Sequence, residues 1–166
     1  GALWTPRGRK FDGIDDFIAV TLPNLGDTYS IVIWIKPDIT TAGEIFDGTA
    51  GWDGQISVLI DGYIQLCGNG SGGYATSAAG VVTSGAFYQV AGIFSGKTKT
   101  GYVNTVQVAT HTEATFSNLF GAGRTIGKGM NNGRYPGLIG EVWIYNRALT
   151  VSEILRIYQA TRFRYQ

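Results

Sequence analysis

Two loop-like segments of this sequence carry the mixture of side chains that binds sugars. One is Thr49-Ala-Gly-Trp-Asp-Gly and the other is Gly129-Met-Asn-Asn-Gly-Arg-Tyr. A sugar is held when an aromatic ring covers its apolar face while amides and carboxylates bond to its hydroxyls. Tyr74, which lies between the two segments, adds a further aromatic ring. The predicted ligand-binding set is therefore Trp52, Asp53, Tyr74, Asn131, Asn132, Arg134 and Tyr135. The alternative is that Trp52 and Tyr135 anchor their loops by packing and the asparagines only form turns.

Hydrolysis of a glycosidic bond would require two carboxylates that flank the bond. The chain has no Glu-x-Asp-x-Glu run on any expected strand, and its glutamates are Glu44, Glu113, Glu141 and Glu153. His111 is the single histidine and Cys67 the single cysteine, so there are too few ligands for a transition-metal site. No nucleophile elbow and no phosphate-binding glycine loop before a helix is present. The sequence therefore predicts no catalytic residue, no enzyme activity and no cofactor.

The net charge of +1 conceals an uneven distribution. Six of the 13 basic residues lie in the first ten or the last eleven positions, and all 12 acidic residues lie between them. Aromatic residues are interleaved with these cations, which suits docking on an acidic partner surface. The predicted docking set is Trp4, Arg7, Arg9, Lys10, Arg162, Phe163, Arg164 and Tyr165. The alternative is that both ends are simply solvated.

Short strands separated by turn signals must position these residues. Twenty-five glycines and only four prolines suit many tight turns. Expected strands cover residues 17–22, 29–36, 44–47, 55–60, 63–67, 87–94, 101–110, 124–128 and 138–145. Asp61-Gly62 predicts a hairpin turn, and residues 68–80 form either a loop or a weak edge strand. Thr150 and Glu153 form a capping box that predicts a helix from residue 151 to about 160.

The length of 166 residues predicts a single domain over residues 1–166, with basic terminal segments at 1–10 and 160–166. There is no apolar run of the length that a membrane-spanning helix needs. The first ten residues lack the apolar stretch of a secretion signal, so a signal was either removed or never present. Cys67 cannot form an internal disulfide, and its strand-like surroundings predict a buried, inert thiol.

Four segments together resemble the laminin G-like domains of the concanavalin A-like lectin/glucanase superfamily. They are Phe11-Asp-Gly-Ile-Asp-Asp-Phe, Tyr29-Ser-Ile-Val-Ile-Trp-Ile-Lys-Pro, Phe87-Tyr-Gln-Val-Ala-Gly-Ile-Phe and the stretch from Gly140 to Ile154. The resemblance implies an all-β fold, an antiparallel jelly-roll β-sandwich with one short C-terminal helix. It also implies ligands on rim loops or on the concave face. Family members often carry an acidic residue where this chain has Gly140, so a structural calcium ion is not expected.

These observations predict a non-enzymatic module for binding, adhesion or structural display. The first hypothesis is a bacteriophage virion surface or decoration protein that docks on a capsid or tail scaffold and binds cell-surface glycans. The second is a carbohydrate- or protein-binding domain of a secreted bacterial or eukaryotic protein. The localisation is accordingly the virion surface or the extracellular space, with no nucleic acid and no membrane insertion. Exposed sheet edges also leave self-association open.

Overall fold

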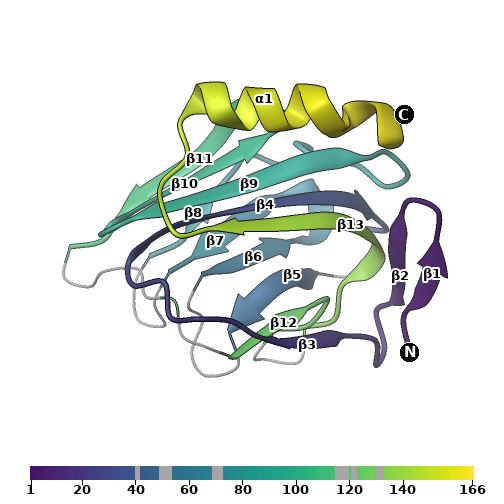
Figure 1. The fold of residues 1–166 in the computed structure, drawn as a ribbon. Coiled ribbons are helices and arrows are strands. Elements are labelled where there is room, and N and C mark those ends of the chain that lie inside the picture. Colours follow the sequence, from purple (N-terminus) through teal and green to yellow (C-terminus); the bar gives the residue numbers. More distant parts are fainter. Residues whose placement is uncertain (40–41, 49–53, 69–72, 115–119, 121–122, 130–132) are drawn as a thin grey trace.

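Two antiparallel β-sheets pack face to face, and one helix lies across the outer face of one sheet (Figure 1). The computed structural model describes residues 1–39, 42–48, 54–68, 73–114, 120, 123–129 and 133–166. Sheet A contains, in spatial order, β1 (Leu3–Thr5), β2 (Gly8–Asp12), β13 (Pro136–Tyr145), β4 (Thr28–Pro37), β9 (Tyr88–Ser95), β10 (Thr98–Val103) and β11 (Val106–Thr112). Sheet B contains β3 (Ile18–Thr21), β12 (Gly123–Ile126), β5 (Gly43–Gly48), β6 (Gln55–Val58), β7 (Ile64–Cys67) and β8 (Ala75–Thr76). The expected β-sandwich is confirmed.

Strand β4 is buried on both faces and organises the two cores. Ile31, Ile33 and Ile35 point into the main core between the sheets and are fully buried. Val32 and Trp34 point outward and are covered by the C-terminal helix α1 (Val151–Thr161). This double burial explains why the strand reads as a continuous apolar run, because alternation appears only where one face meets water.

The capping box at the start of α1 forms as expected. The backbone N–H of Glu153 donates to the Thr150 hydroxyl at 3.3 Å, and the Glu153 carboxylate accepts from the Thr150 N–H at 2.8 Å. Arg147 adds a two-pronged ion pair to the same carboxylate, at 2.9 and 2.6 Å. The hydrogen bond from Arg147 and the Thr150 bonds lower the pKa of Glu153 to about 2. These contacts fix the turn that leads the chain from β13 to α1, which covers the outer face of sheet A.

Two hairpins differ from the sequence expectation. The single strand expected over residues 101–110 is two strands, β10 and β11, joined at Asn104 and Thr105. Both turn residues have positive φ, 47° and 76°, as a two-residue hairpin turn requires, but the pair lacks the glycine that usually signals such a turn. The hairpin β1–β2 was not expected at all. Residues 75–76 form the weak edge strand β8, and the Asp61-Gly62 turn is confirmed between β6 and β7.

Two further expectations concern buried groups and membranes. Cys67 is 1% exposed, so its burial is confirmed. Within the described ranges, the structure contains no helix with the length and apolarity needed to cross a membrane.

Candidate functional site

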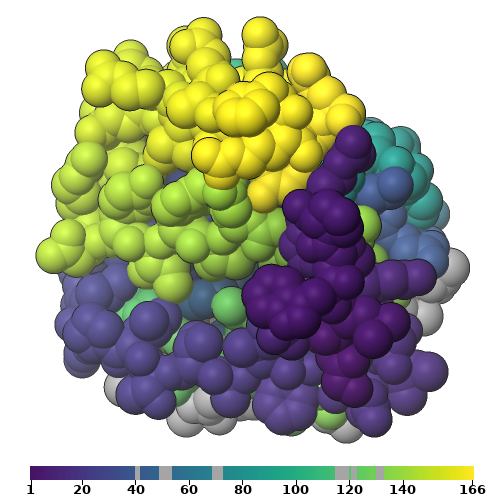
Figure 2. All heavy atoms as spheres, turned by 45° about the vertical axis from the view of Figure 1, so that its right-hand side comes forward, coloured from purple at the N-terminus to yellow at the C-terminus, as the bar shows by residue number. Residues whose placement is uncertain are grey.

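The N-terminal β1–β2 hairpin and the C-terminal segment lie side by side on the surface (Figure 2). The Arg7 guanidinium donates to the backbone carbonyl of Gln166 at 2.8 Å, which ties the β1–β2 turn to the C-terminus. Arg164, in the short helix η2 (Arg162–Arg164), forms an ion pair with Glu141 on β13. Folding therefore joins two basic segments that are about 150 residues apart in the sequence into one surface.

Cation–aromatic pairs dominate this surface. Trp4 is 78% exposed, and the Arg9 guanidinium lies 4.1 Å from the centroid of its indole ring. Phe163 is 67% exposed, and the Arg164 guanidinium lies 5.5 Å from the centroid of its ring. We call the set Trp4, Arg7, Arg9, Phe163 and Arg164 the terminal surface. Exposed tryptophan and arginine are the residue types that concentrate binding energy in protein interfaces.

Trp4 forms a wall of two neighbouring hollows in this surface. One has a volume of about 240 Å³ and is lined also by Arg7, Glu141 and Arg164. The other, of about 270 Å³, lies at the open edge between the two sheets and is lined also by Arg9 and apolar residues of both sheets. A side chain from a partner can therefore contact Trp4 from either side.

Of the remaining predicted docking residues, Tyr165 lies mostly buried beneath the terminal surface, where it lines the first hollow, and Arg162 and Lys10 lie elsewhere. Tyr165 is 7% exposed and stacks on Trp34 at 4.5 Å, so its ring anchors the C-terminus instead of facing a partner. Arg162 lies over Tyr158 of α1, at 6.0 Å. Lys10 alternates with Arg9 along β2 and so points to the opposite face of the hairpin.

The loop residues predicted to bind sugar are only partly covered by the structure. Trp52, Asp53, Asn131 and Asn132 lie outside the described residues. Tyr74 is 42% exposed and remains suitable as a stacking ring. Tyr74 directly precedes β8, whereas Arg134 forms a β-bridge with Glu44 on β5. These two strands are three interstrand spacings apart in sheet B, which is roughly 14 Å. The described members therefore do not form one cluster.

Tyr135 does not present its ring to solvent. It is 1% exposed, its hydroxyl donates to the Leu138 carbonyl at 3.4 Å, and burial together with the nearby Asp38 carboxylate raises its pKa well above the usual value. For this residue the structure matches the alternative of a packed loop anchor. Arg134 is partly buried and lies 5.2 Å from the ring of Phe17.

A row of polar side chains on sheet B was missed in the sequence. The strand pairing aligns Glu44, Ser57, Gln65 and Thr76 across β5 to β8. The signal was present in β6, where polar Gln55 and Ser57 alternate with core residues Ile56 and Val58. This outer face of sheet B is thus lined with hydrogen-bonding groups.

Glu44 is the glutamate in this row, and its environment is unusual. The Gln55 amide donates to one of its carboxylate oxygens at 3.3 Å. Gly129 and Gly133 cover the carboxylate so closely that a Cβ on either glycine would lie within 2.5 Å of a carboxylate atom. Burial raises the pKa of Glu44. The carboxyl group is therefore biased toward its neutral form.

The other three glutamates have ion-pair partners. Glu113 pairs with Lys99, Glu141 with Arg164 and Glu153 with Arg147. Glu44 differs from them, because its hydrogen-bond partner among the described residues is the neutral amide of Gln55.

Replacing Glu44 with glutamine tests this assignment. Because the folded state raises the pKa of Glu44, its charge opposes folding at neutral pH, and wild-type stability rises as the pH falls through the folded pKa. Glu44→Gln removes the charge and keeps the shape, so we expect the midpoint of thermal unfolding at neutral pH to rise by roughly 2 °C. The stabilisation on acidification should shrink. A lower midpoint at neutral pH would contradict the assignment.

The acidic residues near the N-terminus do not fit a calcium site shared with β13. One carboxylate oxygen from each of Asp12, Asp15 and Asp16 lies within 4.8 Å of the others, but Asp12 accepts from the N–H of Ile14 at 2.8 Å and so caps its own loop. Asp12 pairs with Pro136, so position 140 lies four residues, or roughly 13 Å, further along β13.

Position 140 is also closed to an acidic side chain. A Cβ on Gly140 would lie 2.6 Å from the hydroxyl oxygen of Tyr165. That hydroxyl accepts a hydrogen bond from the backbone N–H of Glu141 at 2.9 Å. The tyrosine therefore fills the space that a metal-binding carboxylate would need.

Comparison with protein families places this fold. A laminin G-type model described as the concanavalin A-like lectin/glucanases superfamily matches residues 12–155. The chain belongs to this superfamily. Among curated proteins, none matches the chain.

Solved structures of this superfamily fold come from proteins of different kinds. A heptameric SAP-like pentraxin from Limulus polyphemus has a TM-score of 0.69 at 17% identity, covering 96% of this chain and 85% of the pentraxin. Domain 4 of AbnA, an extracellular arabinanase of Geobacillus stearothermophilus solved with arabinotriose, has a TM-score of 0.65 at 22% identity, with coverage of 92% and 76%. Trypanosoma rangeli sialidase has a TM-score of 0.73 at 14% identity, covering 98% of this chain but only 29% of the sialidase. At these identities the likeness concerns the fold.

Proposed function

We propose that the protein is a non-catalytic binding module that docks on an acidic partner through its terminal surface and recognises carbohydrate on another face. The observation that carries the docking role is the exposed Trp4–Arg9 stack beside Arg7 and Arg164. Charge complementarity makes the partner surface acidic. Arginine and tryptophan together supply both an electrostatic and an apolar contact.

The partner in this proposal is the capsid or tail scaffold of a virion, on whose surface the module is displayed. The alternative setting is a secreted protein in which the same module binds carbohydrate. Structural neighbours support the carbohydrate role, since domain 4 of the arabinanase was solved with arabinotriose. Ion pairing of three of the four glutamates supports the non-catalytic role.

The docking role is tested with variants of the terminal surface. We expect Trp4→Ala and Arg9→Glu each to weaken co-sedimentation with phage particles from the source by about thirtyfold, because such residues contribute about 2 kcal/mol or more at interface centres. Arg156→Glu on the exposed side of α1 is the matched control for charge and should bind like wild type. Equal binding of all three variants would contradict the docking role. Co-sedimentation with cell envelopes instead of virions would favour the secreted alternative.

The carbohydrate role is tested on a glycan array with the intact protein. Tyr74→Ala is the informative loop variant because Tyr74 is exposed, whereas removal of the buried Tyr135 would disturb packing. If the wild-type protein binds no glycan on the array, the proposed carbohydrate-binding role is wrong.

A further inference from the structure

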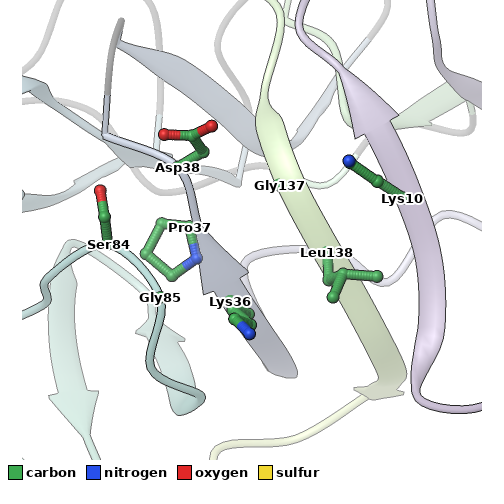
Figure 3. Close-up of a pocket in the computed structure, with 8 residues that line it drawn as sticks. All are labelled: Lys10, Lys36, Pro37, Asp38, Ser84, Gly85, Gly137 and Leu138. Atoms are coloured by element: carbon green, nitrogen blue, oxygen red, sulfur yellow. The ribbon is translucent and has the colours of Figure 1, made fainter.

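An open pocket of about 440 Å³ lies on the outer face of sheet A (Figure 3). Strand pairing aligns Lys10 on β2, Leu138 on β13 and Lys36 on β4 in one row. This row points away from the main core, because its neighbours Ile139 and Ile35 point into it. The pocket thus belongs neither to the terminal surface nor to the loops discussed above.

Two ammonium groups flank the pocket. Lys10 and Lys36 stand two strand spacings apart, about 10 Å between their Cα atoms, with Leu138 between them. Lys36 lies 5.6 Å from the ring centroid of Phe87. In the portion of the chain that is described, neither ammonium group forms an ion pair. Two such cations on either side of an apolar floor can bind one anionic group between them.

The remaining lining residues supply hydrogen bonds and an apolar floor. The Ser84 hydroxyl accepts from the backbone N–H of Ile39 at 2.7 Å, which leaves its own hydrogen to donate to a ligand. Asp38 offers a carboxylate acceptor, and Pro37 lines the floor with Leu138.

Gly137 lines the pocket in a backbone conformation that favours glycine. Its φ is +135°, and a Cβ there would lie 2.4 Å from the Lys36 carbonyl oxygen. Glycine is therefore required by the backbone at this point of the pocket lining. Gly85 on the opposite wall also adds no side chain to the pocket.

We propose that this pocket binds a sugar acid, with the sugar carboxylate between Lys10 and Lys36. The inference rests on the proposed carbohydrate-binding function and names the class of sugar. The apolar floor of Pro37 and Leu138 fits the C–H face of a sugar ring, and Ser84 and Asp38 fit its hydroxyls. Asp38 disfavours ligands with more negative charge, such as a phosphate group, because its carboxylate would repel the second charge.

The experiment measures binding of trigalacturonate and of 3′-sialyllactose to the intact protein by NMR titration. The neutral controls are the methyl ester of trigalacturonate and lactose. We expect only the acids to bind, with the largest shifts at the backbone amides of Gly85 and Gly137. Lys10→Gln and Lys36→Gln should each weaken binding about tenfold, since each removes one charge-assisted hydrogen bond. Arg156→Gln removes the same charge from α1 and should leave affinity unchanged.

The outcomes separate this inference from the function on which it rests. Equal binding of the acid and its methyl ester, or full affinity in both lysine variants, would overturn the sugar-acid pocket. Binding of the protein to neutral glycans alone on the array would also overturn the sugar-acid pocket, but it would agree with the carbohydrate-binding function. No binding to any glycan would defeat both. Shifts confined to other surfaces would place the acid elsewhere and likewise overturn the pocket.

Discussion

Ending the chain at Ala160 is expected to lower the free energy of unfolding by about 4 kcal/mol or more. The Thr161 hydroxyl accepts from the indole N–H of Trp34 at 2.9 Å, and the Tyr165 ring stacks on the same indole. Removing both leaves a buried N–H without its acceptor and exposes a core tryptophan. The last six residues are therefore part of the folded structure, although their basic composition suggests a detachable tail.

Urea unfolding followed by tryptophan fluorescence measures this effect. Phe163→Ser is the matched control, because Phe163 lies in the same segment but is exposed, and its replacement should change stability by less than about 0.5 kcal/mol. A truncated protein within about 1 kcal/mol of wild type would show that the terminal segment is dispensable. Truncation is also unsuited to testing docking, which is why point variants of the terminal surface are needed.

The second large effect is expected at the buried ion pair of Lys99 and Glu113. Lys99 is 0% exposed and Glu113 is 6% exposed, so neither charge is solvated. Lys99→Met should lower the free energy of unfolding by about 3–5 kcal/mol, because it leaves the Glu113 carboxylate buried without its cation. Among the described residues, the carboxylate would then keep the N–H of Gly73, at 3.0 Å, and His111, at 3.5 Å.

Combining Lys99→Met with Glu113→Leu should recover much of the lost stability, since no buried charge then remains. Urea unfolding of the two single variants and the double variant measures the coupling. A double variant no more stable than Lys99→Met would contradict the explanation.

The pH dependence gives a separate readout of the same pair. Burial raises the pKa of Glu113, but the hydrogen bonds from Lys99 and from the Gly73 N–H outweigh it, and the net shift is downward. A lowered folded pKa gives stability that is present above the unfolded pKa and is lost as the pH falls through the folded pKa. Wild type should therefore lose this contribution only in acid, below the usual glutamate pKa. In Lys99→Met burial would instead raise the folded pKa of Glu113 above the unfolded one, so the variant should gain stability as the pH falls through that pKa.

The helix cap and the hairpin turn could be predicted from the sequence because each depends on residues only a few positions apart. The capping box of Thr150 and Glu153 needs only neighbours three positions apart, and the Asp61-Gly62 turn needs only backbone freedom at two positions. The apolar run of β4 also predicted a buried strand. Together with the family-like segments, these features determined the β-sandwich with its closing helix.

The proposed binding surfaces depend on contacts that no local pattern encodes. The terminal surface exists because the β1–β2 hairpin pairs with β13, whose bulge at Gly140 admits the Tyr165 ring. The pocket between Lys10 and Lys36 likewise depends on a register that aligns these two residues across β13.

Whether an aromatic residue is exposed was also decided only by packing. Tyr135 and Tyr165 stand in polar sequence stretches much like those around Tyr74 and Phe163, yet the first two are buried. The sequence by itself determined most of the strands, the Asp61-Gly62 turn, the helix and the uneven charge. Only the tertiary structure decided which of these side chains face water, because burial is set by strand pairing between residues far apart in the chain.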